Sequence, residues 1–425
     1  MSGRQLSGVR VLDMSRVLAG PLAGQMLGDL GAEVIKVERP GVGDESRFYG
    51  PPFLDADVER TDLESAIFLA ANRNKQAIAV DFTRAEGQAL LRQLIAASDV
   101  LIENYKVGTL KRYGLDYESL RELHPGLIYC SVTGYGQTGP HRDRPGYDAI
   151  FQAEGGLMHS IGHPDGQPGA GPMRVGFSMV DIVTSLYADI AILAALYRRD
   201  ANGGSGEHID LSLLESCVAV TSHHAMHYLM SGQLPIRRGN TSGGGGVPSG
   251  MFACQQGSIV ITVGNDEQYK RFCDLIGRPD LASDPRFAVN QARASNREAM
   301  AQVLNEVFAT APAEEWQRRL VAGGIAVGQV NDLSQVFQDP QIRARGTEVS
   351  VPHRSGKPLR MVANPIHFRN QPIDEYQAPP RYDEHTERVL RDILSLDEAR
   401  IAALRRAGVI AQRHTDRSAA SDETA

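Results

Sequence analysis

The first forty residues contain the pattern that most constrains the fold of this chain. An apolar run, V-R-V-L-D-M (residues 9–14), precedes a short loop, S-R-V-L-A-G-P (residues 15–21), in which Pro21 marks the start of a helix. A second apolar run follows that helix and ends at Glu38 and Arg39. Strand, helix and strand in this order predict a βαβ unit, the opening of a doubly wound α/β domain. In such folds, loop 15–21 lies where ligands bind.

Loop 15–21 suggests a ligand that carries a nucleotide, but it lacks the glycine spacing of a dinucleotide site. No G-x-G-x-x-G follows the first predicted strand. An NAD-dependent oxidoreductase is therefore a weakened alternative, and a ligand other than NAD is favoured.

The alternation of strand and helix continues after Arg39 and predicts a parallel sheet in a Rossmann-like large domain. Three further apolar runs lie at residues 77–81, 99–104 and 127–132. A helix is expected between the first two, at residues 84–97. A longer segment, residues 175–199, is apolar nearly all round and predicts a buried helix, although it includes Asp181 and Asp189.

A chain of 425 residues exceeds what one core usually supports, so we expect two domains. Glycine-rich stretches near residues 203–206 and 240–250 indicate a hinge and a mobile loop. We expect a large α/β domain, a linker, a smaller α+β domain, a segment that returns to the large domain, and a disordered tail. Their respective ranges are 1–205, 206–228, 229–330, 331–410 and 411–425.

Charge and cysteine content exclude several classes of partner. The net charge of -7 argues against nucleic acid and favours small molecules. The four cysteines lie far apart, and His223, His224 and His227 have no acidic partner at ligand spacing, so we expect no metal and no disulfide framework. We also expect no apolar leader and no run approaching the roughly 18 residues of a membrane span. A cytoplasmic protein without membrane contact is therefore expected.

Asp181 is the sharpest candidate for a reactive group. Its neighbours Val180 and Ile182 are apolar, and a carboxylate in such surroundings is poorly solvated and reactive. From the residues alone, a helix N-cap is nevertheless the more frequent role of such an aspartate. For Asp189, two turns further along, a structural role is favoured more strongly.

A run of four glycines predicts a segment that moves or approaches another group closely, because each glycine costs a regular element ~1 kcal/mol relative to alanine. The four are Gly243, Gly244, Gly245 and Gly246. They form either a flap that closes over a reacting carbonyl or a linker between domains. Basic residues at strand ends or in loops could also meet phosphates at one edge of the sheet. These are Arg39, Lys75, Arg84, Arg112 and Arg144.

A series of motifs occurs in one order along the chain. They are V-L-D-M-S-R-V-L-A-G-P, G-D-L-G-A-E-V-I-K-V-E-R-P, N-R-N-K-Q-A-I-A-V-D, V-L-I-E-N-Y, S-V-T-G-Y-G-Q-T-G-P, R-P-G-Y-D, V-D-I-V-T-S and G-S-G-E-H-I-D-L-S-L-L-E-S. In this order they resemble the class III CoA-transferases, the family of formyl-CoA:oxalate and carnitine CoA-transferases. The likeness extends from about Leu6 to Ile410.

This resemblance implies that Asp181 of V-D-I-V-T-S is a nucleophile, which reverses the preference for a cap. It also implies an interlocked homodimer, a flap at the four glycines, a coenzyme A thioester as substrate and no permanently bound cofactor. The implied CoA contacts are Val17, Leu18, Ala19, Arg39, Val80, Asp81, Phe82, Thr83, Asn104, Tyr105, Lys106, Arg112, Pro145, Gly146, Tyr147 and Asp148.

The chain departs from two members of this fold family. The formyl-CoA enzyme has a glutamine in place of Leu18 and a tyrosine in place of Ile67, so an oxalate pocket is disfavoured. An α-methylacyl-CoA racemase has a histidine in place of Tyr147, and a neutral tyrosine is a poor general base at pH 7. The racemase is thus an unfavoured alternative, as is a CoA-binding regulator without chemistry.

The segment S-R-F-Y-G-P-P-F (residues 46–53) resembles the branch that transfers CoA from succinyl-CoA to dicarboxylates such as glutarate, itaconate or malate. A dicarboxylate requires a cation for its distal carboxylate. The candidates are Arg16, Arg47, Arg174 and His159.

Overall fold

The computed structural model describes residues 4–241 and 246–412, and the chain divides into two compact units. The larger unit comprises the described residues of Met1–Leu157, Arg174–Met226 and Arg345–Ala425. The smaller unit comprises those of Met158–Met173 and His227–Ala344. The chain therefore leaves the larger unit twice and returns to it twice.

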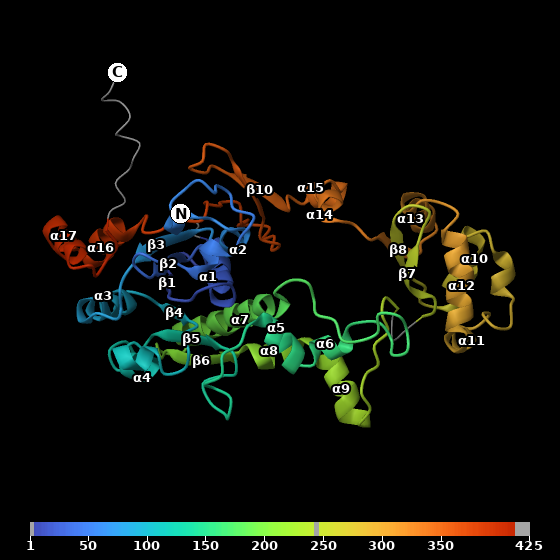
Figure 1. Ribbon diagram of the computed structural model, residues 1–425, viewed down its shortest axis with the longest axis horizontal. Coiled ribbons are helices and arrows are strands. Elements are labelled where there is room, and N and C mark those ends of the chain that lie inside the picture. The colour runs from blue at the N-terminus through green and yellow to red at the C-terminus, as the bar shows by residue number, and fades with distance from the viewer. Residues whose placement is uncertain (1–3, 242–245, 413–425) are drawn as a thin grey trace, which may run out of the picture. The chain divides into compact units, whose positions relative to one another are not determined.

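A six-stranded sheet forms the centre of the larger unit (Figure 1). All neighbouring strands are parallel, in the order β3-β2-β1-β4-β5-β6. The strands are β1 (Arg10–Asp13), β2 (Glu33–Glu38), β3 (Lys75–Ala79), β4 (Val100–Glu103), β5 (Ile128–Thr133) and β6 (Glu207–Ser212). The predicted Rossmann-like parallel sheet is confirmed.

The strand order reverses between β1 and β4, because the chain adds β2 and β3 on one side of β1 and the remaining strands on the other. At such a point the connections leave on opposite sides and open a crevice at the carboxyl ends of the two strands. Residues 14–18 follow β1 and residues 104–107 follow β4. Both loops therefore lie at this crevice.

Helices cover both faces of the sheet. Leu12 of β1 belongs to a core formed with α3 (Ala85–Ala96), α16 (Thr386–Leu394) and α17 (Glu398–Arg406). Asp13 faces the other side, since successive residues of a strand alternate. A Cβ on Gly24 of α1 (Ala19–Asp29) would lie 2.9 Å from the Oδ2 atom of Asp13. Helix α1 therefore covers that second face, and it packs against α7 (Met179–Ala201).

Helix α7 corrects one expectation from the sequence. It has 23 residues, and an 18-residue window within it has a mean hydropathy of 1.8, so by length and composition it could cross a membrane. The expectation that no segment approaches this length is therefore wrong. Within the larger unit, α7 packs against α1, α8 (Leu213–Val220), β5 and β6, as the core helix of a doubly wound domain does.

Residues 206–228 do not form the predicted linker. They supply β6, α8 and the start of α9 (Ser222–Ser231). The nearby glycines serve a tight connection from α7 to β6. Gly203 and Gly204 have φ angles of +97° and +90°, and a Cβ on Gly206 would lie 2.0 Å from the carbonyl oxygen of Leu127. Glycine enrichment here reflects turn geometry and close packing within the larger unit.

The C-terminal part of the larger unit contains a hairpin of β10 (Glu348–Val351) and β11 (Leu359–Val362), followed by α16 and α17. Ile410 pairs with Val80, and Ala411 is only 3% exposed. Ala411 is therefore packed rather than part of the predicted tail, whose residues 413–425 lie outside the described part of the chain. The larger unit also contains shorter helices, α2 (Ala66–Ala71), α4 (Tyr117–Leu120) and α5 (Asp148–Glu154).

The smaller unit contains an antiparallel sheet of β7 (Ser249–Ala253), β8 (Ser258–Thr262) and β9 (Ala326–Gln329). Its core includes Phe308 and Trp316, whose rings meet edge to face at 5.2 Å. Its helices include α10 (Asp266–Leu275), α11 (Asn290–Ser295), α12 (Arg297–Phe308), α13 (Ala313–Ala322), α14 (Leu333–Val336) and α15 (Pro340–Ala344). A short helix, α6 (Leu157–Ser160), begins at the boundary of the two units.

Candidate functional site

The loops that follow β1 and β4 are tied to each other. The side-chain oxygen of Asn104 accepts the N–H of Arg16 at 2.9 Å, and its Nδ2 donates to the carbonyl oxygen of Arg16 at 2.7 Å. Asn104 thus binds both backbone groups of one residue across the point where the strand order reverses. The resemblance implied that Asn104 contacts CoA, whereas its side chain is engaged in fixing the neighbouring loop.

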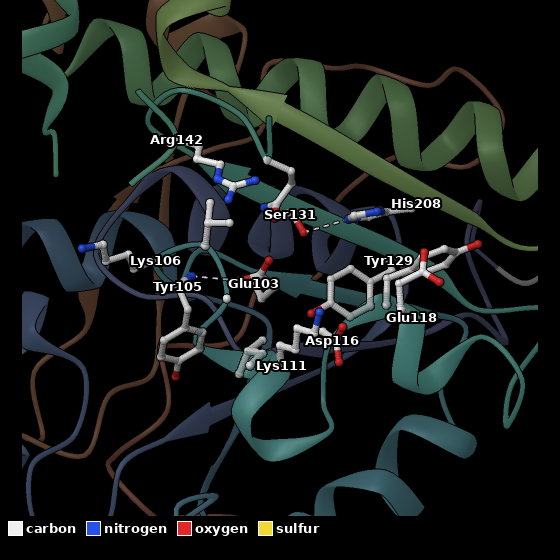
Figure 2. Close-up of a pocket in the computed structure, with 15 residues that line it drawn as sticks. Glu103, Tyr105, Lys106, Lys111, Asp116, Glu118, Tyr129, Ser131, Arg142 and His208 are labelled. Atoms are coloured by element: carbon white, nitrogen blue, oxygen red, sulfur yellow. Dashed lines mark hydrogen bonds between the residues drawn. The ribbon is translucent and has the colours of Figure 1, made fainter. Parts of the chain in front are cut away.

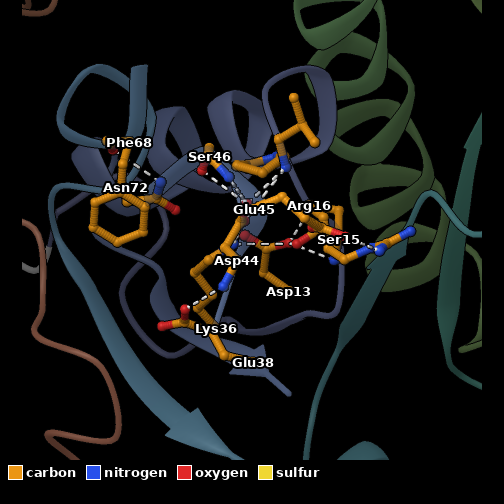
Figure 3. Close-up of polar contacts among 12 residues, drawn as sticks. Asp13, Ser15, Arg16, Lys36, Glu38, Asp44, Glu45, Ser46, Phe68 and Asn72 are labelled. Atoms are coloured by element: carbon orange, nitrogen blue, oxygen red, sulfur yellow. Dashed lines mark hydrogen bonds and ion pairs between the residues drawn. The ribbon is translucent and has the colours of Figure 1, made fainter. Parts of the chain in front are cut away.

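A buried ion pair holds the loop after β1 (Figure 3). The side chains of Lys36 and Asp44 are 0% and 1% exposed, with 2.7 Å between Nζ and Oδ2. The Nζ atom of Lys36 also donates to the carbonyl oxygen of Ser15 at 3.1 Å, and the Asp44 carboxylate accepts the N–H of Val17. Val17 has a φ of +70°, which is rare for a β-branched residue. Buried charges therefore hold this loop in an uncommon conformation.

Asp181 lies at the same edge of the sheet as these loops. Helix α7 leads into β6, and a crossover helix runs antiparallel to the strand that follows it, so its first turn lies at the carboxyl ends of the strands. Burial raises the pKa of the Asp181 carboxyl to about 7, and the negative charge of Asp148 adds to this increase. Asp181 is not the N-cap of α7, because Ser178 occupies that position. The favoured interpretation of Asp181 from residues alone, a cap, is therefore wrong.

Asp148, the first residue of α5, supplies an acceptor at the start of α7. Its Oδ2 atom accepts the N–H of Val180 at 2.7 Å and the N–H of Asp181 at 3.3 Å. Gln152, one turn further along α5, donates to its Oδ1 atom at 2.6 Å. The unpaired N–H groups of a helix N-terminus favour a negatively charged acceptor. Asp148, predicted to contact CoA, thus has a carboxylate committed to orienting the turn that carries Asp181.

Arg16 presents a partly exposed guanidinium at this edge (Figure 3). Its Nη1 atom lies 2.5 Å from Oε1 of Glu45, and the guanidinium lies 4.8 Å from the centre of the Tyr105 ring. Burial raises the pKa of the Tyr49 phenol, with further effects from the charges of Tyr147, Glu45 and Arg16. Tyr147 directly precedes the aspartate that accepts the N–H groups of α7.

Aromatic side chains join two of the predicted CoA-binding segments. Phe82, after β3, meets Tyr105 and Tyr113 edge to face, with ring centroids 5.3 Å apart in both pairs. The structure thus brings residues 80–83 and 104–106 together. The more exposed predicted contacts are Arg39, Thr83, Lys106, Arg112, Pro145 and Tyr147.

Three other predicted contacts have roles in packing. Val80 is 1% exposed. The Asp81 carboxylate accepts the N–H of Thr83 at 2.9 Å and its hydroxyl at 2.6 Å, which orders the turn before α3. A Cβ on Gly146 would lie 2.2 Å from the ring of Phe151, so that position requires glycine.

A pocket of about 310 Å³ lies against β4, β5 and β6 in the larger unit (Figure 2). Tyr105 and Lys106 line it, together with Glu103, whose carboxyl has a pKa raised to about 7 by burial. Ser131 of β5 pairs in register with Glu103 of β4, and its Oγ atom is 3.1 Å from Nε2 of His208 on β6. Two predicted CoA contacts therefore face a cavity with a buried acid. Its other lining residues are Val107, Gly108, Leu110, Lys111, Asp116, Tyr117, Glu118, Tyr129, Gln137 and Arg142.

Two predicted ligand-binding cations are instead buried in ion pairs. The Nζ atom of Lys75 donates to Asp13 at 2.8 Å, and burial lowers the pKa of this amine to about 8. The fully buried guanidinium of Arg47 binds both carboxylate oxygens of Glu38, at 2.8 and 2.7 Å. The predictions of Lys75 as a phosphate contact and of Arg47 as a ligand for a distal carboxylate are therefore wrong. Each cation neutralises an acid inside the fold.

The predicted flap lies largely outside the described residues, which exclude Gly243, Gly244 and Gly245. Gly246 is buried in the smaller unit, where a Cβ would lie 1.7 Å from the carbonyl oxygen of Val263. That position requires glycine for packing alone, and the flap stays a prediction.

The sequence analysis missed Asp44, Lys36 and Glu103. One signal was present: a lysine inside the apolar run V-I-K-V requires a buried partner, since an unpaired charge in a core is costly. The first carboxylate after that run is Glu38, which pairs with Arg47, and Asp44 is the partner that Lys36 uses. Glu103 had a weaker signal, its place at the carboxyl end of a predicted strand.

Comparisons with known proteins agree on one family. The profile of CoA-transferase family III matches residues 6–386. The chain is 41% identical to the succinate–glutarate CoA-transferase of Agrobacterium fabrum, over 92% of this chain and 96% of that protein. It is 39% identical to the succinyl-CoA:glutarate CoA-transferase of Homo sapiens, over 97% and 91% of the two chains. The crystal structure of a CAIB/BAIF family protein from Brucella suis matches with a TM-score of 0.83 at 40% identity, over 92% and 100%.

Proposed function

The chain belongs to CoA-transferase family III, and we propose that it moves CoA from succinyl-CoA to a dicarboxylate acceptor by way of Asp181. The observation that carries this proposal is the carboxylate of Asp181, placed on the first turn of α7 with a pKa raised by burial and by Asp148. A carboxylate of raised pKa is a more basic nucleophile. The relatives that act on succinyl-CoA and glutarate support the choice of donor and acceptor.

The reaction that we propose begins and ends with one thioester and passes through anhydrides of Asp181. The Asp181 carboxylate attacks the carbonyl carbon of succinyl-CoA and releases CoA thiolate, which leaves a mixed anhydride of Asp181 and succinate. The thiolate then attacks the aspartyl carbonyl, so that succinate leaves and an aspartyl-CoA thioester remains. An acceptor carboxylate attacks that thioester, and the returning thiolate takes the acceptor acyl group and frees Asp181. No ATP and no metal are needed, because one thioester replaces another.

The protein must orient Asp181 and keep water away from the anhydrides. Asp148 orients the first turn of α7 through the N–H groups of Val180 and Asp181. We propose that the glycines of 243–246 close over the site and exclude water. Loop 17–19 forms the wall of the acyl pocket, while the exposed cations Arg39, Lys106 and Arg112 meet the CoA phosphates.

Arg16 is the cation that we assign to the distal carboxylate of the acceptor. Of the four candidates, Arg47 is excluded by its buried pair with Glu38. Arg16 lies beside Tyr105 and donates to Glu45, while its Nε atom is buried without a hydrogen-bond partner among the described residues. A substrate carboxylate could replace Glu45 and bind the guanidinium through two parallel hydrogen bonds.

We further propose that the enzyme is an interlocked homodimer of the cytoplasm. Support comes from apolar side chains that stay exposed in the single chain, including Ile190 and Tyr197 of α7, at 62% and 76%, and Leu229 of α9, at 72%. Exposed apolar patches of this kind mark protein interfaces. Analytical ultracentrifugation tests this directly, and a monomer at micromolar concentration would contradict it.

A trapping experiment tests the nucleophile. The enzyme is mixed with succinyl-CoA without acceptor and then treated with hydroxylamine, which converts an aspartyl thioester into an aspartyl hydroxamate. Peptide mass spectrometry should find the hydroxamate at residue 181, and transfer to glutarate, malate or itaconate should be measurable. Asp181→Ala should lower kcat/KM by about 10³-fold or more, whereas Asp189→Asn on the same helix serves as the control. A hydroxamate at another residue, or near-normal turnover of Asp181→Ala, rejects the assignment.

A further inference from the structure

Val17 is held in a conformation that its side chain disfavours. Its φ of +70° lies in the left-handed region, which a β-branched residue enters only when the surrounding structure imposes it. Among the described residues, the others that combine a side chain with positive φ are Asn74, Asp383 and Ser395, and none of them is β-branched. Backbone strain of this kind concentrates at functional sites, and Val17 lies at the crevice where β1 and β4 diverge.

The Asp44 carboxylate is the group that imposes this conformation. It accepts the N–H of Val17, at 3.2 Å to Oδ1 and 3.3 Å to Oδ2. The carboxylate is itself fixed, because Nζ of Lys36 donates to Oδ2 at 2.7 Å and both the N–H and the hydroxyl of Ser46 donate to Oδ1 at 2.8 Å. Figure 3 shows this carboxylate between Lys36 and the loop. A rigid, buried acceptor therefore lies directly behind a strained residue.

The preceding residue is restrained from the other side. Asn104 binds the N–H and the carbonyl oxygen of Arg16, so the peptide groups on both sides of Arg16 are fixed. With Arg16 held by one partner and Val17 by another, the direction of the Arg16 side chain and the entry into α1 at Leu18 are determined. The two restraints act on adjacent residues of the loop that forms the wall of the acyl pocket.

We propose that Asp44 is a positioning residue that selects the left-handed conformation of Val17 and thereby aims Arg16 and Leu18 into the acyl pocket. This inference rests on the proposed function, because it treats that loop as part of the transferase site. Asp44 does not touch the reacting atoms. It acts through the backbone of Val17, and its loss lets Val17 relax to a negative φ and turns the neighbouring side chains away.

A double-mutant cycle separates this role from ordinary stabilisation. Glycine reaches positive φ without steric cost, so Val17→Gly removes the strain against which Asp44 works. We expect Asp44→Ala, which removes the acceptor, to lower kcat/KM for the acceptor acid about 10-fold or more, but less than about 3-fold in the Val17→Gly background. Equal factors in both backgrounds would show that Asp44 does not act through Val17 and would overturn the inference.

The control is a second buried carboxylate of the larger unit. Asp62 is 7% exposed and pairs with Arg381 at 3.1 Å. Asp62→Ala should lower the melting temperature without lowering kcat/KM and without coupling to Val17→Gly. If Asp44→Ala does not fold, Ser46→Ala removes one donor to the same carboxylate and takes its place in the cycle. If Ser46→Ala then lowered kcat/KM by the same factor in the wild-type and Val17→Gly backgrounds, the inference would be overturned.

A measurement of CoA affinity keeps this test distinct from the test of function. The dissociation constant of CoA is measured by calorimetry for all four proteins of the cycle, since loop 17–19 is a proposed CoA contact. If the wild type lacks transferase activity while the cycle is coupled in CoA affinity, the proposed function fails and the role of Asp44 stands. If the wild type is active and the cycle is additive in both measurements, the role of Asp44 fails and the function stands.

Discussion

The carboxylate of Asp148 lies directly behind Asp181 and accepts the N–H of that residue at 3.3 Å. One group therefore has two effects on the nucleophile. As a cap it fixes the first turn of α7, and as a negative charge it adds to the rise in the pKa of the Asp181 carboxyl that burial causes. The helix N-terminus alone favours ionisation of Asp181, so Asp148 offsets part of that effect. The result is an oriented carboxylate of raised basicity.

The raised pKa predicts an acid limb in the pH profile of the first half-reaction. Protonated Asp181 cannot attack the thioester, so kcat/KM for succinyl-CoA should rise about 10-fold per pH unit below an apparent pKa near 7 and level off above it. Rapid-quench measurement of succinate release, without acceptor, measures this limb without interference from acceptor ionisation. Asp189→Asn should leave the limb in place. A limb near pH 4 would show that Asp181 is not desolvated.

Asp148→Asn separates the charge of the cap from its geometry. The side-chain oxygen of asparagine also accepts hydrogen bonds, so the N–H of Val180 keeps an acceptor. Removal of the negative charge should lower the pKa of Asp181 and move the acid limb toward lower pH, by up to about one unit. The plateau rate should fall modestly, because a less basic carboxylate is a weaker nucleophile.

Asp148→Ala provides the matching variant without an acceptor. It leaves the N–H of Val180 unpaired, which should cost about 1–2 kcal/mol of stability and reduce the plateau rate more than asparagine does. Identical pH profiles for the asparagine and wild-type proteins would contradict the electrostatic role of Asp148.

Arg16→Gln should discriminate between acceptors. Loss of a charge-assisted pair with the distal carboxylate should raise KM for a dicarboxylate about 10- to 100-fold and leave KM for a monocarboxylate of equal chain length unchanged. Arg16→Lys keeps the charge but lacks the planar guanidinium. Its KM for the dicarboxylate should therefore lie between those of the wild type and Arg16→Gln. Steady-state kinetics with both acceptors measures the difference. Arg112→Gln is the control, because an exposed residue assigned to CoA should affect both acceptors alike. If Arg16→Gln raised KM equally for both acceptors, Arg16 would not be the residue that binds the distal carboxylate.

Much of the fold follows from local pattern. The run V-R-V-L-D-M, the helix after Pro21 and the second apolar run correspond to β1, α1 and β2, because buried parallel strands and amphipathic helices differ in their periodicity. The linker prediction for 206–228 failed because glycine enrichment marks tight turns and close packing as well as hinges. Gly206, pressed against Leu127, is an instance of close packing.

The site was less accessible to sequence reasoning. Asp181 became a candidate through apolar neighbours and through a motif, but its cap lies 33 residues away in the chain. The Lys36–Asp44 pair and the strain at Val17 likewise depend on which segments meet in three dimensions. No local rule places a distant carboxylate behind a given backbone N–H, so the roles of Asp148 and Asp44 required the structure.

Asp189 should make the protein less stable as the pH rises. It is 6% exposed, and both carboxylate oxygens lack a hydrogen-bond partner among the described residues. Burial raises the pKa of this carboxyl to about 8, with a further increase from the charge of Asp29 and an opposing effect from Lys75. The unfolded chain ionises near pH 4, whereas the folded chain keeps the proton until about pH 8. Between these values the folded state binds more protons, so the free energy of unfolding falls as pH rises.

Asp189→Asn removes this proton linkage while preserving shape. Its melting temperature should match the wild type near pH 4 and exceed it increasingly up to pH 8, where the gain in stability should be on the order of 5 kcal/mol. Differential scanning fluorimetry across this range measures the divergence. Thr184→Ser, a buried hydroxyl on the same helix that bonds to the carbonyl oxygen of Val180, is a control whose offset should not vary with pH. A constant offset for Asp189→Asn would mean that the carboxylate is ionised and paired in the folded protein, contrary to its isolated position on α7.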